Sequence, residues 1–111
     1  MQLNIGSIEL PHAAVLAPMS GITDQPFRRI VRSLGGGLVV SEMIASHAIL
    51  NSIKKEIRKL KFSAKEEAPL SIQLAGWEPE VMAEAAKISE QLGASLIDIN
   101  LGCPAKKVTG R

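Results

Sequence analysis

The feature that most constrains the fold is the repeated order of short apolar segments and helical patterns. A strand-like segment followed by a helix-like segment recurs about every 25–30 residues. Strands that alternate with helices pair in parallel, because each helix carries the chain back to the end of the sheet where the previous strand began. Such crossovers are right-handed. The chain is therefore predicted to form a parallel α/β fold.

The individual segments follow from periodicity and from turn residues. The hairpin predicted at the N-terminus has two alternating segments, residues 2–5 and 8–10, around the two-residue turn Gly6-Ser7. Four buried strands are then predicted at residues 13–17, 38–42, 70–74 and 95–100. Three helices are predicted at about residues 25–34, 45–61 and 79–92, with a polar break at residues 66–69 before the third strand.

The ends of the first and third helices carry capping signals. Thr23 or Asp24 is suited to cap the first helix, and Gly35 supplies the left-handed residue with which many helices end. An apolar face is predicted on this helix at Phe27, Ile30, Val31 and Leu34. Pro79 and Glu80 suit the first turn of the third helix, whose predicted apolar stripe is Val81, Ala85, Ile88 and Leu92.

Two architectures fit this order of elements: an open doubly wound sheet and part of a (β/α)8 barrel. Periodicity does not distinguish them, but the residues after each strand do. All four predicted strands end in polar or glycine-rich segments, at 18–21, 41–43, 73–76 and 100–104. A doubly wound nucleotide-binding fold carries a glycine-rich turn after its first strand, where this chain has Gly21 alone. The pattern favours the barrel: one incomplete domain, residues 1–111, with the first four strands and three helices after a hairpin.

Composition limits the function classes. Hydrophobic residues make up 46% of the chain, enough for one modest core. Thirteen basic and eleven acidic residues give a net charge of +2, which permits contact with a polyanion without requiring it. The single cysteine excludes an internal disulfide and a cysteine-only metal site within these residues. His12 and His47 lack suitably spaced partners, so no metal site is expected. We expect a cytoplasmic protein that is not bound to a membrane.

Two long motifs and two shorter ones resemble a known family. Residues 17–28, APMSGITDQPFR, resemble the opening signature of the tRNA-dihydrouridine synthases. Residues 98–108, DINLGCPAKKV, resemble their active-site signature, and residues 41–43 and 73–76 resemble intermediate motifs at suitable spacing. The resemblance extends over nearly the whole chain and is greatest for the bacterial subgroup B.

This resemblance implies a fold, an activity and two cofactors. Proteins of this family fold as an FMN-binding (β/α)8 barrel followed by a small helical domain. They reduce particular uridines in tRNA to 5,6-dihydrouridine, with NADPH as the reductant of the flavin. Hydride goes from the flavin to C6 of the uracil, and a cysteine donates the proton to C5.

The resemblance also implies site residues. It assigns Cys103 as the proton donor and Asn100 as a residue that positions the uracil. The remaining assignments are flavin contacts, at Pro18, Met19, Ser20 and Gln73. The residue types suit these roles, since a thiol is largely protonated at neutral pH and a carboxamide both donates and accepts hydrogen bonds. Taken alone, each residue has an ordinary structural interpretation, and a lone cysteine is more often a small core residue.

Basic residues occur in two places. Lys106 and Lys107 adjoin the predicted site and are interpreted as contacts to tRNA phosphates. The five basic residues between positions 54 and 61 share helical faces, and a solvated surface is the preferred interpretation of these.

The length of the chain bears on activity. A complete barrel takes about 250 residues, and the lysine, histidine and phosphate-binding segment that the family uses from later strands have no counterpart in these 111 residues. We expect a truncated part of a longer enzyme that is inactive alone. Two alternatives remain open: another FMN barrel oxidoreductase that acts on a small pyrimidine-like substrate, and a non-catalytic half-barrel that assembles with another chain.

Overall fold

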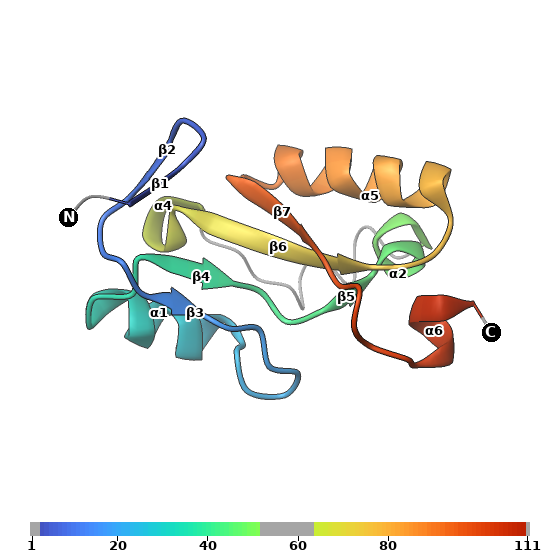
Figure 1. Cartoon of the computed structure of the whole chain (residues 1–111), viewed down its shortest axis with the longest axis horizontal. Coiled ribbons are helices and arrows are strands. Elements are labelled where there is room, and N and C mark those ends of the chain that lie inside the picture. The colour runs from blue at the N-terminus through green and yellow to red at the C-terminus, as the bar shows by residue number, and fades with distance from the viewer. Residues whose placement is uncertain (1–2, 52–63, 111) are drawn as a thin grey trace.

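A parallel sheet forms the framework of the computed structural model, which describes residues 3–51 and 64–110 (Figure 1). An antiparallel hairpin precedes it, formed by β1 (Leu3–Ile5) and β2 (Ile8–Leu10) around Gly6-Ser7, as predicted. The strands of the sheet are β3 (Val15–Leu16), β4 (Leu38–Val40), β5 (Ile44–Ala45), β6 (Leu70–Ala75) and β7 (Leu96–Ile99).

The strands lie in the order in which they occur along the chain. β3 pairs with β4, β4 and β5 pair with successive parts of β6, and β7 pairs with β6 along residues 71–74. All of these pairs are parallel. A doubly wound sheet instead reverses its order at a switch point. The observed order is that of consecutive barrel strands, so the mixed α/β structure is compatible with a partial (β/α)8 barrel.

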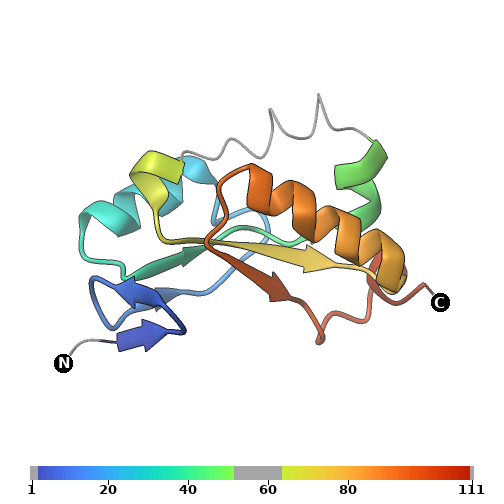
Figure 2. The same ribbon diagram turned by 90° about the horizontal axis from the view of Figure 1, so that it is seen from above.

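The helices cover one face of the sheet. Figure 2 shows four of them on the same side: α1 (Gln25–Ser33), α2 (Ser46–Asn51), α4 (Ala64–Glu67) and α5 (Pro79–Gln91). The hairpin lies across the opposite face near the amino ends of the strands, and α6 (Lys106–Thr109) lies beyond their carboxyl ends. Doubly wound sheets carry helices on both faces. One-sided coverage by these helices therefore also fits a barrel wall.

Alternation along β6 divides the core between the two faces. Leu70, Ile72 and Leu74 are fully buried and belong to the main cluster, together with Ala85 of α5. On the opposite face Leu38 and Val40 of β4 pack in a second cluster with Leu10 of the hairpin and with Leu96. The residues of β6 between the three apolar ones, Ser71 and Gln73, point to this second face.

The ends of helix α1 agree with the prediction, but the side of the helix that is buried does not. Asp24 caps it, with Oδ1 accepting from the Phe27 amide at 3.1 Å, and Gly35 follows it with φ of +108°. The predicted apolar face is wrong as a core face, because Phe27, Ile30 and Leu34 are 38%, 60% and 82% exposed. The side chain that α1 buries is that of Arg28.

Burial of Arg28 depends on a helix that the sequence pattern did not reveal. Helix α4 extends into the predicted polar break at residues 66–69, and its Glu67 carboxylate lies 2.5 Å from Arg28 Nε. Arg28 is 2% exposed and Glu67 is fully buried. Arg28 Nη1 also donates to Thr23 O at 2.8 Å. A buried cation and anion that also have hydrogen-bond partners can replace an apolar contact between two elements.

Arg32, one turn further along α1, anchors the loop beyond the helix. Its Nη1 donates to the carbonyl oxygens of Gly36 and Gly37, and its Nη2 donates to Ala68 O. Partial burial lowers the pKa of Arg32. The guanidinium thus joins the end of α1 to the start of β6.

The remaining differences from the predicted elements are local. The first predicted strand is short and exposed, since β3 has two residues and Val15 is 51% exposed. β5 and α6 were not predicted. The predicted helix at 45–61 is observed as α2 up to Asn51, and its continuation and basic residues lie outside the described residues. Helix α5 agrees with its prediction, with Ala85 buried and Ile88 packed on the core.

Among the described helices, none has the length and apolarity required to cross a bilayer.

Two adjacent acidic residues of α4 allow a matched test of the buried ion pair. In the complete gene product that contains these residues, Glu67→Gln is expected to lower the free energy of unfolding by about 3 kcal/mol, because it removes the negative charge that lies 2.5 Å from the buried Arg28 guanidinium. Glu66→Gln, whose carboxylate meets Arg29 at 2.8 Å on the surface, is expected to change it by less than about 1 kcal/mol. Urea unfolding measures both. Equal losses would contradict the distinction.

Candidate active site

The segments after the strands meet at one edge of the sheet, here called the C-terminal edge. They are the loop between β3 and α1, the junction between β4 and β5, the loop between β6 and α5, and the loop between β7 and α6 (Figure 1). In parallel α/β folds, ligands bind at this edge. Most of the site residues suggested by the sequence lie on these segments, whereas Gln73 lies within β6, and Lys106 and Lys107 lie on α6.

The loop after β3 is held by its own hydrogen bonds. Met19 O accepts from the amides of Ile22 and Thr23, at 3.0 and 2.9 Å. The buried hydroxyl oxygen of Thr23 accepts from the Met19 amide at 2.9 Å. Gly21 has φ of +78°, a conformation that favours glycine. The turn from Met19 to Thr23 is therefore closed by hydrogen bonds. Of the predicted flavin contacts in this loop, Pro18 is half-buried, and Met19 and Ser20 are exposed.

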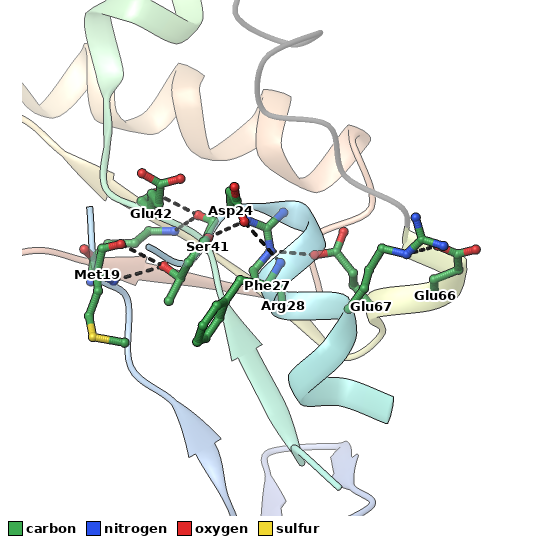
Figure 3. Close-up of polar contacts among 11 residues, drawn as sticks. Met19, Asp24, Phe27, Arg28, Ser41, Glu42, Glu66 and Glu67 are labelled. Atoms are coloured by element: carbon green, nitrogen blue, oxygen red, sulfur yellow. Dashed lines mark hydrogen bonds and ion pairs between the residues drawn. The ribbon is translucent and has the colours of Figure 1, made fainter. Parts of the chain in front are cut away.

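A carboxylate from the neighbouring junction fixes the tip of this loop. Glu42 Oε2 accepts from the Gly21 amide at 2.7 Å, and Figure 3 shows Glu42 directed toward the loop that contains Met19. Ser41, next to Glu42, continues the connection into the sheet. Its amide donates to Ser71 O at 2.9 Å and its Oγ accepts from the Gln73 amide at 3.0 Å. The loop after β3 is thus tied to β6 at the position of Gln73.

Gln73 and Asp98 are paired across adjacent strands. The parallel register of β6 and β7 sets Gln73 opposite Asp98, so both side chains lie on the face away from the helices. Gln73 Nε2 donates to Asp98 Oδ2 at 2.5 Å. On its other side, Gln73 Oε1 accepts from Asn100 Nδ2 at 3.3 Å. The buried carboxamide of Gln73 is therefore held between two residues of the β7 segment.

Asn100 shapes the turn that carries Cys103. Its Oδ1 accepts from the amides of Gly102 and Cys103, at 3.1 and 2.9 Å. A side-chain oxygen that accepts from the backbone two and three residues ahead stabilises a turn. The Cys103 thiol is free and half-buried. The backbone beside it is accessible, since a Cβ placed on Gly102 would meet no atom within 4 Å.

The far end of this loop rests on Trp77. Gly110 ends α6 with φ of +75°, and a Cβ there would lie 2.7 Å from the indole ring. The imidazole ring of His47 also lies next to the indole, with the two ring centroids 5.3 Å apart. His47 Nε2 also lies 3.1 Å from Glu78 Oε1. The loop from Asn100 to Gly110 is thus fixed at both ends, by an amide at its start and an aromatic ring at its end.

The structure brings some of the predicted site residues together. Gln73, Asn100 and Cys103 are linked by hydrogen bonds, and the Pro18-to-Ser20 turn is joined to Gln73 through Glu42 and Ser41, as given above. Lys106 is exposed on α6, and the side chain of Lys107 lies outside what the structure describes. The roles assigned to these residues stay predictions.

Sequence reasoning missed several residues that organise the site. Asp98 stands two positions before Asn100, a spacing that puts both on one face of a strand and could have identified it. Glu42 lay within a recognised motif without an assigned role. His47 was interpreted as having no suitably spaced partner for a metal site, and its contact with Glu78, 31 residues away, could not be read from spacing. Among the residues described, no three of His, Cys, Asp or Glu gather as a potential metal site.

The fold and the site together define a class: a parallel α/β protein with amide, carboxylate and thiol groups gathered at the C-terminal edge. Comparison with protein families identifies the family within this class. Residues 15–111 match the model of the dihydrouridine synthase family, described as "Dihydrouridine synthase (Dus)". The chain belongs to this family.

Curated relatives agree with this assignment. The chain is 51% identical over 108 residues to a "Probable tRNA-dihydrouridine synthase" of Rickettsia conorii, and 52% identical over 110 residues to one of Rhodobacter capsulatus. It is 49% identical over 110 residues to "tRNA-dihydrouridine synthase B" of Pseudomonas aeruginosa. These matches cover 97%, 99% and 98% of the chain but 33%, 34% and 32% of the relatives. The chain thus spans about a third of their length.

Two glycines with positive φ provide a test of the contact between α6 and Trp77. Gly6→Ala places a Cβ in open space, so its cost is the backbone strain alone, about 1–2 kcal/mol. Gly110→Ala adds the overlap with the indole, and we expect a further loss of at least about 1 kcal/mol in the free energy of unfolding. Urea unfolding of both variants of the complete gene product measures the difference. Equal losses would show that the indole does not hold α6.

Proposed function

We propose that this chain forms the first half of a flavin-dependent (β/α)8 barrel that reduces uridine in tRNA to 5,6-dihydrouridine. The observation that carries the proposal is the linked group Gln73, Asn100 and Cys103 at the C-terminal edge, in a chain of the dihydrouridine synthase family. The names of the relatives support tRNA as the substrate. The one-sided helix layer and the sequential strand order support the barrel.

The residues at the C-terminal edge fit an FMN ring. Gln73 uses one N–H and one lone pair within the described chain, which leaves a second N–H and a second lone pair for a ligand. A flavin edge presents both acceptors and a donor. A Cβ on Gly21 or on Gly102 would meet open space, so a planar ligand can approach both loops closely. Pro18, Met19, Ser20 and Gln73 would hold the group, which, reduced by NADPH, supplies hydride to C6 of the uracil.

Cys103 supplies the proton in this proposal. Addition of hydride at C6 of the uracil leaves the electron pair of the former C5–C6 double bond on C5, conjugated with the C4 carbonyl. The thiol of Cys103 donates its proton to C5, which completes the single bond and leaves a thiolate. The Asn100 hydrogen bonds hold the backbone of Cys103, so the thiol is presented from a defined turn.

Asn100 and two lysines are assigned to the RNA. Asn100 Nδ2 has one N–H beyond the one donated to Gln73, and we propose that it donates to a uracil oxygen. Lys106 and Lys107 follow the Cys103 turn and are proposed to contact phosphates. The mild net charge of +2 agrees with a local rather than an overall attraction to RNA.

Replacement of the thiol tests the chemical step. In the complete gene product, Cys103→Ala is expected to reduce dihydrouridine formation by at least about a hundredfold, the usual size of a lost general acid. Oxidation of NADPH in the absence of tRNA is expected to continue at the wild-type rate. Mass spectrometry of tRNA nucleosides measures the product. Undiminished product would remove Cys103 from the mechanism, and reduction of free uracil or dihydroorotate oxidation without action on tRNA would favour a small-substrate enzyme.

Replacement of the lysines tests the RNA contact. Lys106→Ala and Lys107→Ala are each expected to weaken tRNA binding and to reduce by about 1 the slope of log K against log salt concentration. Lys87→Ala, on the exposed side of α5, is the matched control and is expected to leave both unchanged. Filter binding at several salt concentrations measures affinity and slope together. Wild-type slopes in both variants would exclude the two lysines from the phosphate contacts.

A further inference from the structure

A row of hydrogen bonds connects β7, β6 and the Cys103 turn. It runs from Asp98 Oδ2 to Gln73 Nε2, from Gln73 Oε1 to Asn100 Nδ2, and from Asn100 Oδ1 to the Cys103 amide. We call these four residues the amide row. Its two amide side chains stand between a carboxylate at one end and backbone N–H groups at the other.

The carboxylate at one end sets a direction for the whole row. An ionised carboxylate only accepts hydrogen bonds, so Gln73 must turn its nitrogen toward Asp98 and its oxygen toward Asn100. That oxygen also only accepts, so Asn100 must present its nitrogen to Gln73. The oxygen of Asn100 then faces the backbone amides of the turn. An amide reversed anywhere in the row would bring two acceptors or two donors together.

Burial makes this direction matter. Gln73 is 7% exposed, so water has little access to replace a lost partner of its carboxamide. Asp98 and Asn100 are half-buried on the same face of the β7 segment. Ser41 Oγ accepts from the Gln73 amide, which fixes the backbone from which the Gln73 side chain projects. The register of β6 and β7 therefore holds the row in place. Because Gln73 is buried, water cannot readily replace its partners and allow its carboxamide to turn over.

We propose that Asp98 is a positioning residue for the Cys103 turn, which it orients through Gln73 and Asn100. Asp98 does not contact the turn itself. Its carboxylate selects the orientation of both amides, and the second amide holds the backbone of the cysteine. That this orientation of the turn serves proton donation by Cys103 rests on the proposed function. The direction of the hydrogen bonds does not depend on it.

The proposal predicts the effect of reversing the row one residue at a time. Asn100→Asp keeps an oxygen for the turn but sets its other oxygen against Gln73 Oε1, and Gln73 is prevented from reversing by Asp98. The double variant Asp98→Asn/Asn100→Asp has the same net charge and nearly the same shape as the natural chain. In it Asn at position 98 donates to Gln73 Oε1, Gln73 Nε2 donates to Asp at position 100, and the turn keeps its acceptor.

Hydrogen exchange of the Cys103 amide reports on the row directly. The complete gene product is labelled isotopically at cysteine for NMR, and the Cys103 signal is assigned by its loss in Cys103→Ser. Exchange is expected to accelerate about tenfold in Asn100→Asp, the factor that corresponds to loss of one ordinary hydrogen bond. In the double variant it is expected to return to within about threefold of the natural rate. Urea unfolding midpoints are measured in parallel and are expected to show the same recovery.

Two comparisons decide the outcome. Relief of charge repulsion between positions 98 and 100 would also favour the double variant, so the cycle is repeated with Gln73→Leu, where recovery is expected to vanish. Recovery that persists without Gln73, or a double variant no better than Asn100→Asp in exchange and midpoint, would overturn the proposal. If Asn100→Asp does not fold but the double variant does, the proposal is supported. None of these measurements needs flavin or tRNA, so failure of the proposed function would be seen separately, in product formation.

Discussion

The alternation of side chains along β6 is the constraint on which the rest of the structure depends. Six consecutive residues of this strand are buried, and it pairs with β4, β5 and β7. Leu70, Ile72 and Leu74 face the helices and hold the main core together. The same period of two sends Ser71 and Gln73 to the other face, where polar groups need partners. The apolar core and the polar site are therefore two consequences of a single strand register.

Partners for these polar groups come from neighbouring strands and from the segments that follow them. Ser41 bridges the interruption between β4 and β5, where backbone pairing with β6 gives way to a side-chain contact. Asp98 of β7 and Asn100, just beyond it, form hydrogen bonds with the side chain of Gln73. Glu42 accepts a hydrogen bond from the loop after β3. The segments that follow β3, β4 and β7 thus share one hydrogen-bonded network with β6 itself. Such a network holds loops in place in the way that a packed core holds strands.

Local sequence patterns were sufficient for most of the fold and for the placement of the motif residues at the C-terminal edge of the sheet. The hairpin, β6 and α5 follow from alternation, from Gly6-Ser7 and from Pro79, because each signal acts over a few residues. The motifs around Cys103 also placed the thiol just beyond a strand. What the patterns could not supply was long-range pairing. Arg28 is buried because Glu67, 39 residues away, lies opposite it. From its charge alone, Arg28 was assigned to the exposed side of α1, so the predicted core face of this helix was wrong. Asp98 acquires its importance only once β6 is aligned beside β7.

The sequential order of the strands also bears on how the chain is made. Each strand of the sheet pairs with one that precedes it in the sequence, apart from β3, which is the first, and the short β5, whose partner β6 follows. During synthesis the amino-terminal strands leave the ribosome first, and each new βα unit then meets an edge that has already formed. The loop that closes at each of these steps is a single crossover between successive strands. The protein can therefore assemble from its amino end, with each unit acting as the template for the next.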